Sequence, residues 1–240
     1  MSLPDVVSRE DWVRARKDLL LREKQMTRER DALNADRRRL PMVRIDKEYV
    51  FEGEAGKASL LELFGDSRQL IIYHAMFDPE WEKACPGCTA GMDESSDGLQ
   101  AHLKTRDTEY VRVSRAPYPK LAAYKKEHGW TFPWYSSYGS DFNYDFHVTL
   151  DATITPVEYN YRTADELDAG WSGEQPGYSC FLRDGDTIFH TYSTYARGTE
   201  MAGNDAYSLL DLTALGRQEE WEEPKGRSES VRSATPDFAS

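Results

Sequence analysis

A pair of cysteines follows the most apolar segment of this sequence. Residues 70–77 read Leu-Ile-Ile-Tyr-His-Ala-Met-Phe, a run typical of a strand that is buried on both faces. Residues 85–88 read Cys-Pro-Gly-Cys, and a proline in this place suits the first turn of a helix. Apolar residues between 92 and 103 return at near-helical spacing. We therefore expect the CxxC motif where a buried strand gives way to a helix.

The next segments continue the alternation of strand and helix. Residues 110–114 read Tyr-Val-Arg-Val-Ser and predict a second strand. Residues 119–128 predict a short helix, with Pro119 near its first turn and Gly129 just past its end. Such a series implies parallel strands joined by right-handed crossovers, so we expect an α/β fold.

The second half of the chain predicts an antiparallel element. Residues 180–183 and 187–190 flank the turn dipeptide Asp184-Gly185, which is the pattern of a hairpin. Residues 151–177 show no regular pattern and are expected to form an irregular insertion before that hairpin. Residues 204–215 predict a helix that is closed by Gly216.

Both ends of the sequence differ from the central domain, which we place at residues 42–221. Apolar residues between Ser8 and Arg39 return at intervals typical of an amphipathic helix, so residues 1–41 are expected to form a helical arm that Ser8 caps. Ser, Glu, Arg and Pro dominate residues 222–240, which predicts a disordered tail.

The charge of the chain limits its expected partners. The formal net charge is −12, from 30 basic and 42 acidic residues, so the protein repels a phosphate backbone and nucleic acid is not an expected partner. The charge is uneven, because residues 9–39 hold 11 Lys/Arg against 7 Asp/Glu, so this segment carries +4 and the remainder −16. No run approaches the roughly 20 apolar residues that span a bilayer, and no secretion signal is visible. We therefore expect a cytoplasmic protein with no membrane partner.

Three cysteines occur, too few for the disulfide framework of a secreted scaffold. The N–H groups and dipole at a helix start stabilise a thiolate, so the pKa of Cys85 should lie below about 8.5. Cys88, one turn later, can attack a mixed disulfide at Cys85. The spacing thus predicts Cys85 as nucleophile and Cys88 as resolving thiol. Two other uses of the cysteines stay open. They could bind zinc together with Cys180 and a histidine, or they could be inert structural cysteines. Because the sequence has no second CxxC motif, the zinc site is the less expected use, and we expect no cofactor.

Four longer stretches identify a family. They are 113–117 (Val-Ser-Arg-Ala-Pro), 129–137 (Gly-Trp-Thr-Phe-Pro-Trp-Tyr-Ser-Ser), 141–146 (Asp-Phe-Asn-Tyr-Asp-Phe) and 190–198 (His-Thr-Tyr-Ser-Thr-Tyr-Ala-Arg-Gly). With them, the sequence from about Ser8 to Glu219 resembles a bacterial family of thioredoxin-like proteins of unknown function, predicted to be dithiol–disulfide oxidoreductases. The resemblance implies a thioredoxin-like central sheet flanked by helices, with Cys85 and Cys88 at the paired-cysteine positions. It names no substrate.

The chain departs from the wider thioredoxin-like superfamily in one place. There, a proline precedes the third core strand and faces the cysteines. Here residues 178–180 read Tyr-Ser-Cys and Pro176 lies slightly too early, so binding of extended protein substrates is less expected. Cys180 is near enough in sequence to this position to form an alternative disulfide, although a buried apolar cysteine is the commoner fate. The peroxiredoxin signature Pro-x-x-x-Thr-x-x-Cys is absent, because residue 82 is Glu.

Other side chains are candidates for a substrate pocket or for support of the thiolate. Eight aromatic residues lie between 130 and 146, and they suit a ligand pocket or a subunit interface as well as a core. Arginines near a thiolate stabilise it, alternation would put His190 and Tyr192 on one strand face, and His74 could relay a proton to Cys88. Each of these residues also has a structural explanation. The candidates are Arg115, Trp130, Trp134, Tyr178, Cys180, His190, Tyr192 and Arg197.

Together these features favour an oxidoreductase. In this hypothesis Cys85 attacks a disulfide or another oxidised sulfur of an unknown substrate, Cys88 releases the product, and an external thiol reductant regenerates the pair. One alternative is a non-catalytic thioredoxin-fold module with an aromatic ligand or subunit surface, and another is a peroxiredoxin-like thiol peroxidase. The helical arm and the aromatic residues are compatible with a homodimer.

Overall fold

The computed structural model describes residues 3–167, 171–199, 220 and 225 of the chain. The chain divides into two compact units, one containing the arm and the other beginning at Met42. The predicted helix over 204–215 and the tail over 222–240 lie outside the described residues, apart from Lys225. No helix in the described part of the chain is long and apolar enough to cross a bilayer.

The arm is a single helix, α1 (Arg9–Arg37). Ser8 caps it as predicted, because its hydroxyl accepts a hydrogen bond from the Asp11 backbone N–H at 3.1 Å. Acidic residues in the first turn and Arg37 in the last turn complement the helix dipole.

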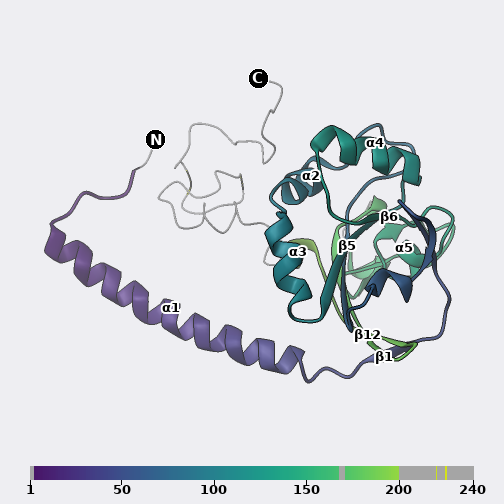
Figure 1. The fold of residues 1–240 in the computed structure, drawn as a ribbon. Coiled ribbons are helices and arrows are strands. Elements are labelled where there is room, and N and C mark those ends of the chain that lie inside the picture. Colours follow the sequence, from purple (N-terminus) through teal and green to yellow (C-terminus); the bar gives the residue numbers. More distant parts are fainter. Residues whose placement is uncertain (1–2, 168–170, 200–219, 221–224, 226–240) are drawn as a thin grey trace. The chain divides into compact units, whose positions relative to one another are not determined.

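The second unit is built on one eight-stranded sheet (Figure 1). Its order is β1-β12-β11-β4-β5-β6-β2-β3. The strands β4, β5 and β6 are parallel neighbours, and all other pairs are antiparallel. Their bounds are β1 (Val43–Ile45), β2 (Val50–Gly53), β3 (Gly56–Ser59), β4 (Gln69–His74), β5 (Thr108–Ser114), β6 (Trp134–Ser136), β11 (Gly177–Asp184) and β12 (Thr187–Tyr195).

The predicted crossover helices are present, with one difference. The segment after the CxxC motif forms two helices, because Ser96 starts a second one by accepting a hydrogen bond from the Leu99 backbone N–H. Gly129 ends α4 in the left-handed conformation at φ 68°, as its position predicts. The helices of this unit are α2 (Pro86–Asp93), α3 (Asp97–Lys104), α4 (Tyr118–His128) and α5 (Phe142–Asp145), with short 3₁₀ turns at Glu62–Phe64, Ala164–Glu166 and Ala196–Thr199.

The central strands have a thioredoxin-like arrangement. A β4–α2–β5 unit provides two parallel strands, and the β11–β12 hairpin adds to the other edge of β4 in the order β12-β11-β4-β5. The CxxC motif lies at the start of the first crossover helix, α2. The fold is therefore mixed α/β and thioredoxin-like, as expected.

The two faces of this sheet are packed separately. We call the first the cysteine face; it carries Tyr73, Tyr110 and Tyr178, which belong to one buried cluster with residues of α2, among them Cys88, and of α4. The second, which we call the histidine face, carries Ile72, His74 and Val111 and is covered by the rings of α5 and Phe146. Successive residues of β4 alternate between these faces, as strand geometry requires.

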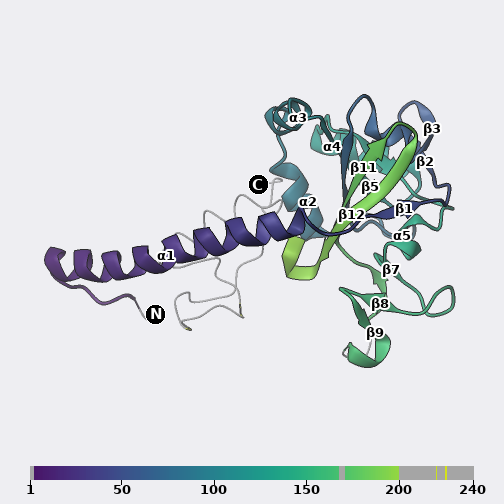
Figure 2. The ribbon, with the colours of Figure 1, turned by 90° about the horizontal axis from the view of Figure 1, so that it is seen from below.

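The expected insertion contains short pieces of regular structure. Two two-stranded sheets form there, β7 (Thr149–Leu150) with β10 (Gly173–Glu174), and β8 (Glu158–Tyr159) with β9 (Arg162–Thr163). These strands form a lobe at one side of the central sheet (Figure 2). The segment thus joins α5 to the hairpin and leaves the thioredoxin-like core intact.

Candidate active site

Hydrogen bonds hold the loop between β4 and α2 in a fixed path. Cys85 N–H donates to the Met76 carbonyl at 2.9 Å, which returns the chain to the end of β4. The Lys120 ammonium of α4 donates to the carbonyls of Pro79 and Trp81, at 2.6 Å each. The loop that carries the first cysteine is therefore fixed from both sides. Lys120 was not a sequence candidate, since a lysine in a short helix gives no signal of such a contact.

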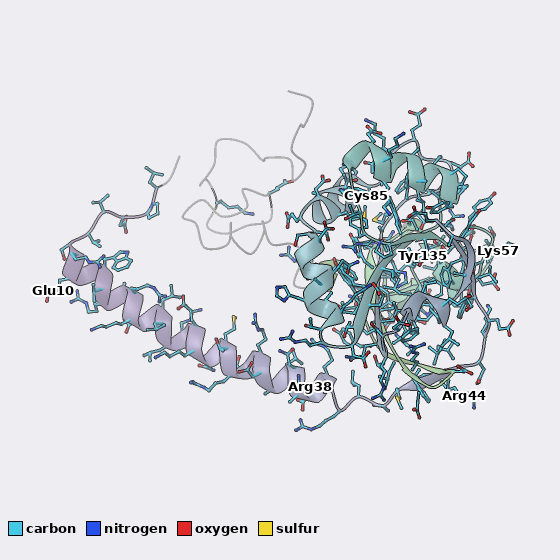
Figure 3. All side chains as sticks on the ribbon, viewed as in Figure 1. Glu10, Arg38, Arg44, Lys57, Cys85 and Tyr135 are labelled. Carbon is cyan, nitrogen blue, oxygen red and sulfur yellow. The ribbon has the colours of Figure 1, made fainter. Side chains whose placement is uncertain are left out.

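Cys85 is the N-cap residue of α2, with Pro86 in the first turn (Figure 3). Its carbonyl accepts from the Thr89 N–H at 2.9 Å, which closes the first turn. Its side chain is half-buried. A hydrogen bond with Cys88 lowers the pKa of Cys85 to about 6, helped by the N–H groups of Gly87 and Cys88 and opposed by burial. Cys85 is therefore largely a thiolate at neutral pH, as its place at a helix start predicts.

Cys88 lies behind Cys85 and is only 3% exposed. The Met76 N–H donates to its sulfur at 3.4 Å, and Tyr73 belongs to the same buried cluster. The hydrogen bond to Cys85, and then burial, raise the pKa of Cys88 above its usual value. Both cysteines are free thiols. The pair thus combines an accessible thiolate with a buried, protonated partner, as a nucleophile and a resolving thiol require.

A group of tyrosines and one arginine lies behind Cys88 on the cysteine face. The rings of Tyr73 and Tyr178 stack with centroids 4.7 Å apart, and the Tyr178 and Tyr110 hydroxyls lie 3.3 Å apart. The Arg112 guanidinium lies between the rings of Tyr110 and Phe132, at 4.0 and 3.9 Å from their centroids. Of the four residues on the strands, only Tyr178 was a sequence candidate. Alternation along the two parallel strands was the signal that would have placed the other three on this face.

Arg112 is unusual because it is fully buried without a carboxylate. Its Nη2 donates to Ser95 Oγ at 2.5 Å, while Nε and Nη1 have no hydrogen-bond partner. Burial lowers the pKa of Arg112. The stacked rings offset part of the cost of burying this cation.

The strand that follows the insertion begins earlier than predicted. β11 starts at Gly177, so Pro176 immediately precedes it, and the expectation that Pro176 lies too early is wrong. Gly177 gave no strand signal, yet a Cβ there would lie 2.9 Å from the Tyr195 ring, so close packing requires glycine. Gly177 pairs with His74 at the end of β4 that leads to the cysteines. A proline therefore does precede the third core strand.

His74 faces away from the cysteines and is a buried, hydrogen-bonded core histidine, which is the more expected of its two roles, and not a proton relay to Cys88. Its Nε2 hydrogen-bonds Ser179 Oγ, Ser179 Oγ hydrogen-bonds Ser193 Oγ, and Ser193 Oγ hydrogen-bonds His190 Nε2, each at 2.8 Å. Burial lowers the pKa of His74 to about 3. These four residues, which we call the His–Ser chain, link β4, β11 and β12 on the histidine face.

A β-bulge separates His190 from Tyr192. Tyr192 pairs with Cys180 and His190 pairs with Phe181, so Thr191 is the extra residue of β12. His190 therefore shares a face with Ser193, to which it hydrogen-bonds, and packs on the Phe146 and Phe181 rings. The prediction that His190 and Tyr192 share a face is wrong, because a bulge shifts the alternation by one residue.

Cys180 lies deeper in the sheet than the cysteine pair. It is half-buried and pairs with Ile71, two residues before Tyr73 in β4. Two residues of a strand span roughly 6.6 Å, so Cys180 lies away from the end of β4 where Met76 contacts Cys88.

The two candidate arginines lie in different settings. Arg115 follows β5 and forms ion pairs with Asp78 and with Glu174, the latter at 2.7 Å. Its Nη1 also lies 3.5 Å from the Tyr144 hydroxyl. Its guanidinium thus ties the cysteine loop, through Asp78, to the insertion. Arg197 lies in the 3₁₀ turn that follows β12.

The aromatic stretch between 130 and 146 is divided between the two faces and contributes mainly to the core. Trp134 is 3% exposed and donates from Nε1 to Ser114 Oγ at 2.9 Å. Trp130 is half-buried and donates to Asp93 Oδ1 at 2.9 Å. Trp130 borders a cavity of about 420 Å³ at the C-terminal end of α2, and Trp134 borders another of about 410 Å³ that is also lined by residues of β3 and α4. Cys85 lies at the opposite end of α2.

Metal ligands do not gather around the cysteines. Within residues 3–167 and 171–199, no group of three or more His, Cys, Asp or Glu side chains is arranged to hold a metal ion. The two thiols lie among Met76, Tyr73 and the first turn of α2.

Solved structures with related folds are distant. A peroxiredoxin Q of Xanthomonas campestris is 14% identical with a TM-score of 0.41, covering 65% of this chain and 85% of its own. PrxQ of Xylella fastidiosa is 13% identical with a TM-score of 0.42 (67% and 89%), and peroxidoxin BcpB of Mycobacterium tuberculosis is 16% identical with a TM-score of 0.40 (66% and 85%). The thioredoxin-like assignment rests on the strand order given above.

No curated protein has a matching sequence. A family model does match, and it spans residues 1–234, which include the arm, the CxxC motif and the insertion. The chain therefore belongs to the family described as bacterial protein of unknown function (DUF899).

Proposed function

We propose that the protein is a dithiol–disulfide oxidoreductase with Cys85 as nucleophile and Cys88 as resolving thiol. One observation carries this proposal. Cys85 is half-buried at the start of α2 with its pKa lowered to about 6, while Cys88 lies directly behind it, buried and protonated. Inert structural cysteines have no need of this division between an ionised and a protonated thiol.

The reaction follows from the protonation states of the two thiols. The Cys85 thiolate attacks a substrate disulfide, forms a mixed disulfide, and expels one substrate thiolate, which takes a proton from solvent. Cys88 then loses its proton and attacks the Cys85 sulfur. The second substrate thiol leaves with a proton, and the Cys85–Cys88 disulfide forms. The substrate is reduced by two electrons, and an external thiol reductant returns the pair to its dithiol form.

The pH dependence of alkylation tests the nucleophile. In the reduced full-length chain with Cys180→Ser, we expect iodoacetamide to modify Cys85 with a midpoint near pH 6. The matched variant Cys85→Ser should lose this fast reaction and all disulfide exchange, while Cys88→Ser keeps the first step. A midpoint near pH 8.5, the value of an ordinary thiol, would contradict the proposal.

A further inference from the structure

We propose that Arg115 is a positioning residue for attack on the substrate disulfide, because its guanidinium holds the two segments beside Cys85 at a fixed separation. The inference rests on the proposed function and deepens it. It gives Arg115 a role in aligning the substrate with the nucleophile, and not in supporting the thiolate.

The first of these segments is the loop between β4 and α2. Cys85 is anchored to the start of this loop, because its N–H donates to the Met76 carbonyl at 2.9 Å. Asp78 follows two residues later, which is a reach of at most about 7 Å along the chain. Its Oδ1 accepts from the Glu80 N–H at 2.9 Å, and its Oδ2 forms the ion pair with Arg115. The guanidinium therefore holds the loop close to the point where Cys85 is fixed.

The second segment is the short stretch that precedes β11. Gly177 pairs with His74, and the antiparallel direction of the two strands carries the preceding residues toward the end of β4 at which Cys85 is anchored. Glu174 belongs to this stretch and is buried. Its carboxylate accepts from Arg115 Nε at 2.7 Å. One side chain thus contacts both segments.

The two contacts use different donors of one rigid group. Nε donates to Glu174 and Nη2 donates to Asp78, and the planar guanidinium fixes the angle between these two directions. A lysine ammonium is a point charge on a flexible stem, so it keeps the positive charge without fixing the separation of its partners. The bridge therefore requires an arginine.

The Glu174 end of the bridge is itself held in place. The Thr149 hydroxyl donates to the Glu174 carboxylate at 3.0 Å, and the Asn143 amide donates to it at 3.4 Å. The Ser137 hydroxyl donates to the Asn143 carbonyl oxygen at 2.7 Å, and all four side chains are buried. Because Glu174 cannot move freely, Arg115 determines where Asp78 and the cysteine loop lie.

The charge of Arg115 is already matched by two carboxylates. The pKa of Cys85 is lowered first by Cys88 and then by N–H groups of the same motif. Attack on a disulfide, in contrast, requires the nucleophile and both substrate sulfurs to be aligned, so it depends on the segments that border the nucleophile. We therefore expect Arg115 to affect alignment and to leave the ionisation of Cys85 unchanged.

Two probes separate alignment from ionisation in the full-length chain with Cys180→Ala. Iodoacetamide is small and reports the thiolate alone. Two short peptides joined by one disulfide, with a dye on one and a quencher on the other, report attack on a substrate as a rise in fluorescence in a single turnover. We expect Arg115→Lys to slow the peptide reaction by about 10- to 100-fold, while the alkylation rate stays within about twofold. The midpoint of alkylation should stay near pH 6.

Asp78→Ser covers the case in which a change at Arg115 prevents folding. It leaves the buried ion pair between Arg115 and Glu174 intact, and its hydroxyl can still accept from the Glu80 N–H, but it is too short to hold the guanidinium. It should also slow the peptide reaction and spare alkylation.

Lys47→Gln is the matched control. Lys47 bridges two carboxylates as well, Asp141 at 2.8 Å and Asp145 at 2.6 Å, but it does so at α5, which covers the histidine face. We expect it to leave both reactions within about twofold, because its loss does not move the cysteine loop.

The remaining outcomes distinguish the inference from the proposed function. If Arg115→Lys or Asp78→Ser folds and leaves the peptide reaction unchanged, the inference is wrong. It is also wrong if alkylation and the peptide reaction slow equally, because Arg115 then acts on the thiolate itself. If the parent chain does not react with the peptide disulfide, or reacts without Cys85, the proposed function fails instead.

Discussion

The two faces of the central sheet both bury titratable side chains, but they treat them differently. On the histidine face, the His–Ser chain runs from His74 to His190 through three hydrogen bonds of 2.8 Å and lies against the rings of Phe142 and Phe146. On the cysteine face, Cys88 lies directly behind a thiol that reaches the surface at a helix start. Both His74 and Cys85 have a lowered pKa, but only Cys85 is accessible to a substrate, so only its shift marks a reactive site.

The direction of the pKa shifts follows the same division. Burial, and then the nearby His190, lower the pKa of His74 to about 3, which keeps the imidazole neutral at physiological pH. Burial opposes ionisation of Cys85 as well, yet Cys88 and the helix start overcome it and lower that pKa to about 6. One face thus suppresses charge, and the other stabilises it on a single sulfur.

The largest difference between the faces should appear in turnover. Cys88→Ser should lower disulfide reduction by more than about 100-fold and trap the substrate on Cys85, because no thiol remains to release it. Ser193→Ala on the histidine face should keep turnover within about twofold. Mass spectrometry of the trapped adduct and steady-state rates check this. Equal losses in both variants would remove the functional distinction between the faces.

The next effect concerns stability against acid. His74 stays neutral in the native state down to about pH 3, whereas an unfolded histidine binds a proton below about pH 6.5. The free energy of unfolding should therefore fall by up to about 1.4 kcal/mol for each pH unit from pH 6 to pH 4.

Urea unfolding at several pH values checks this contribution. His74→Gln keeps a hydrogen-bonding side chain but does not titrate. The slope of its unfolding free energy against pH should therefore be smaller by up to about 1.4 kcal/mol per pH unit, the contribution of one proton. His102→Gln in α3 is the control, because His102 is exposed, and it should leave the slope unchanged. Parallel curves for wild type and His74→Gln would contradict the assignment.

A smaller loss should follow from breaking the His–Ser chain in its middle. Ser179→Ala leaves His74 Nε2 and Ser193 Oγ without their shared partner and should cost about 1–3 kcal/mol of unfolding free energy. The rate of Cys85 alkylation should stay unchanged. A change in that rate would mean that the two faces are coupled through the sheet.

The smallest effect is expected from Cys180. Because it pairs with Ile71, deeper than Tyr73, Cys180→Ala should change disulfide turnover by less than about twofold. Tryptic mapping of the oxidised chain should find the Cys85–Cys88 disulfide in both proteins. A disulfide from Cys180 to either partner would show that this part of the sheet rearranges.

Local patterns in the sequence determined the elements that carry the site. The apolar run over 70–77 and the proline after Cys85 indicated a buried strand followed by a helix, and both formed. Gly129 and Asp184-Gly185 likewise ended a helix and turned a hairpin, because their backbone conformations are dictated locally. The low pKa of Cys85 also follows from the motif itself, first from its hydrogen bond with Cys88 and then from the N–H groups at the helix start.

Long-range packing decided the rest. A single bulge at Thr191 places His190 on the opposite face from Tyr192. β11 begins at Gly177, where the close approach of the Tyr195 ring leaves no room for a Cβ, and no local pattern predicts a strand there. Tyr73 shares a buried cluster with Cys88, and Arg112 lies between two rings, only because the tertiary fold brings β4, β5 and α2 together. Such contacts depend on which segments become neighbours, and no periodicity within one segment contains that information.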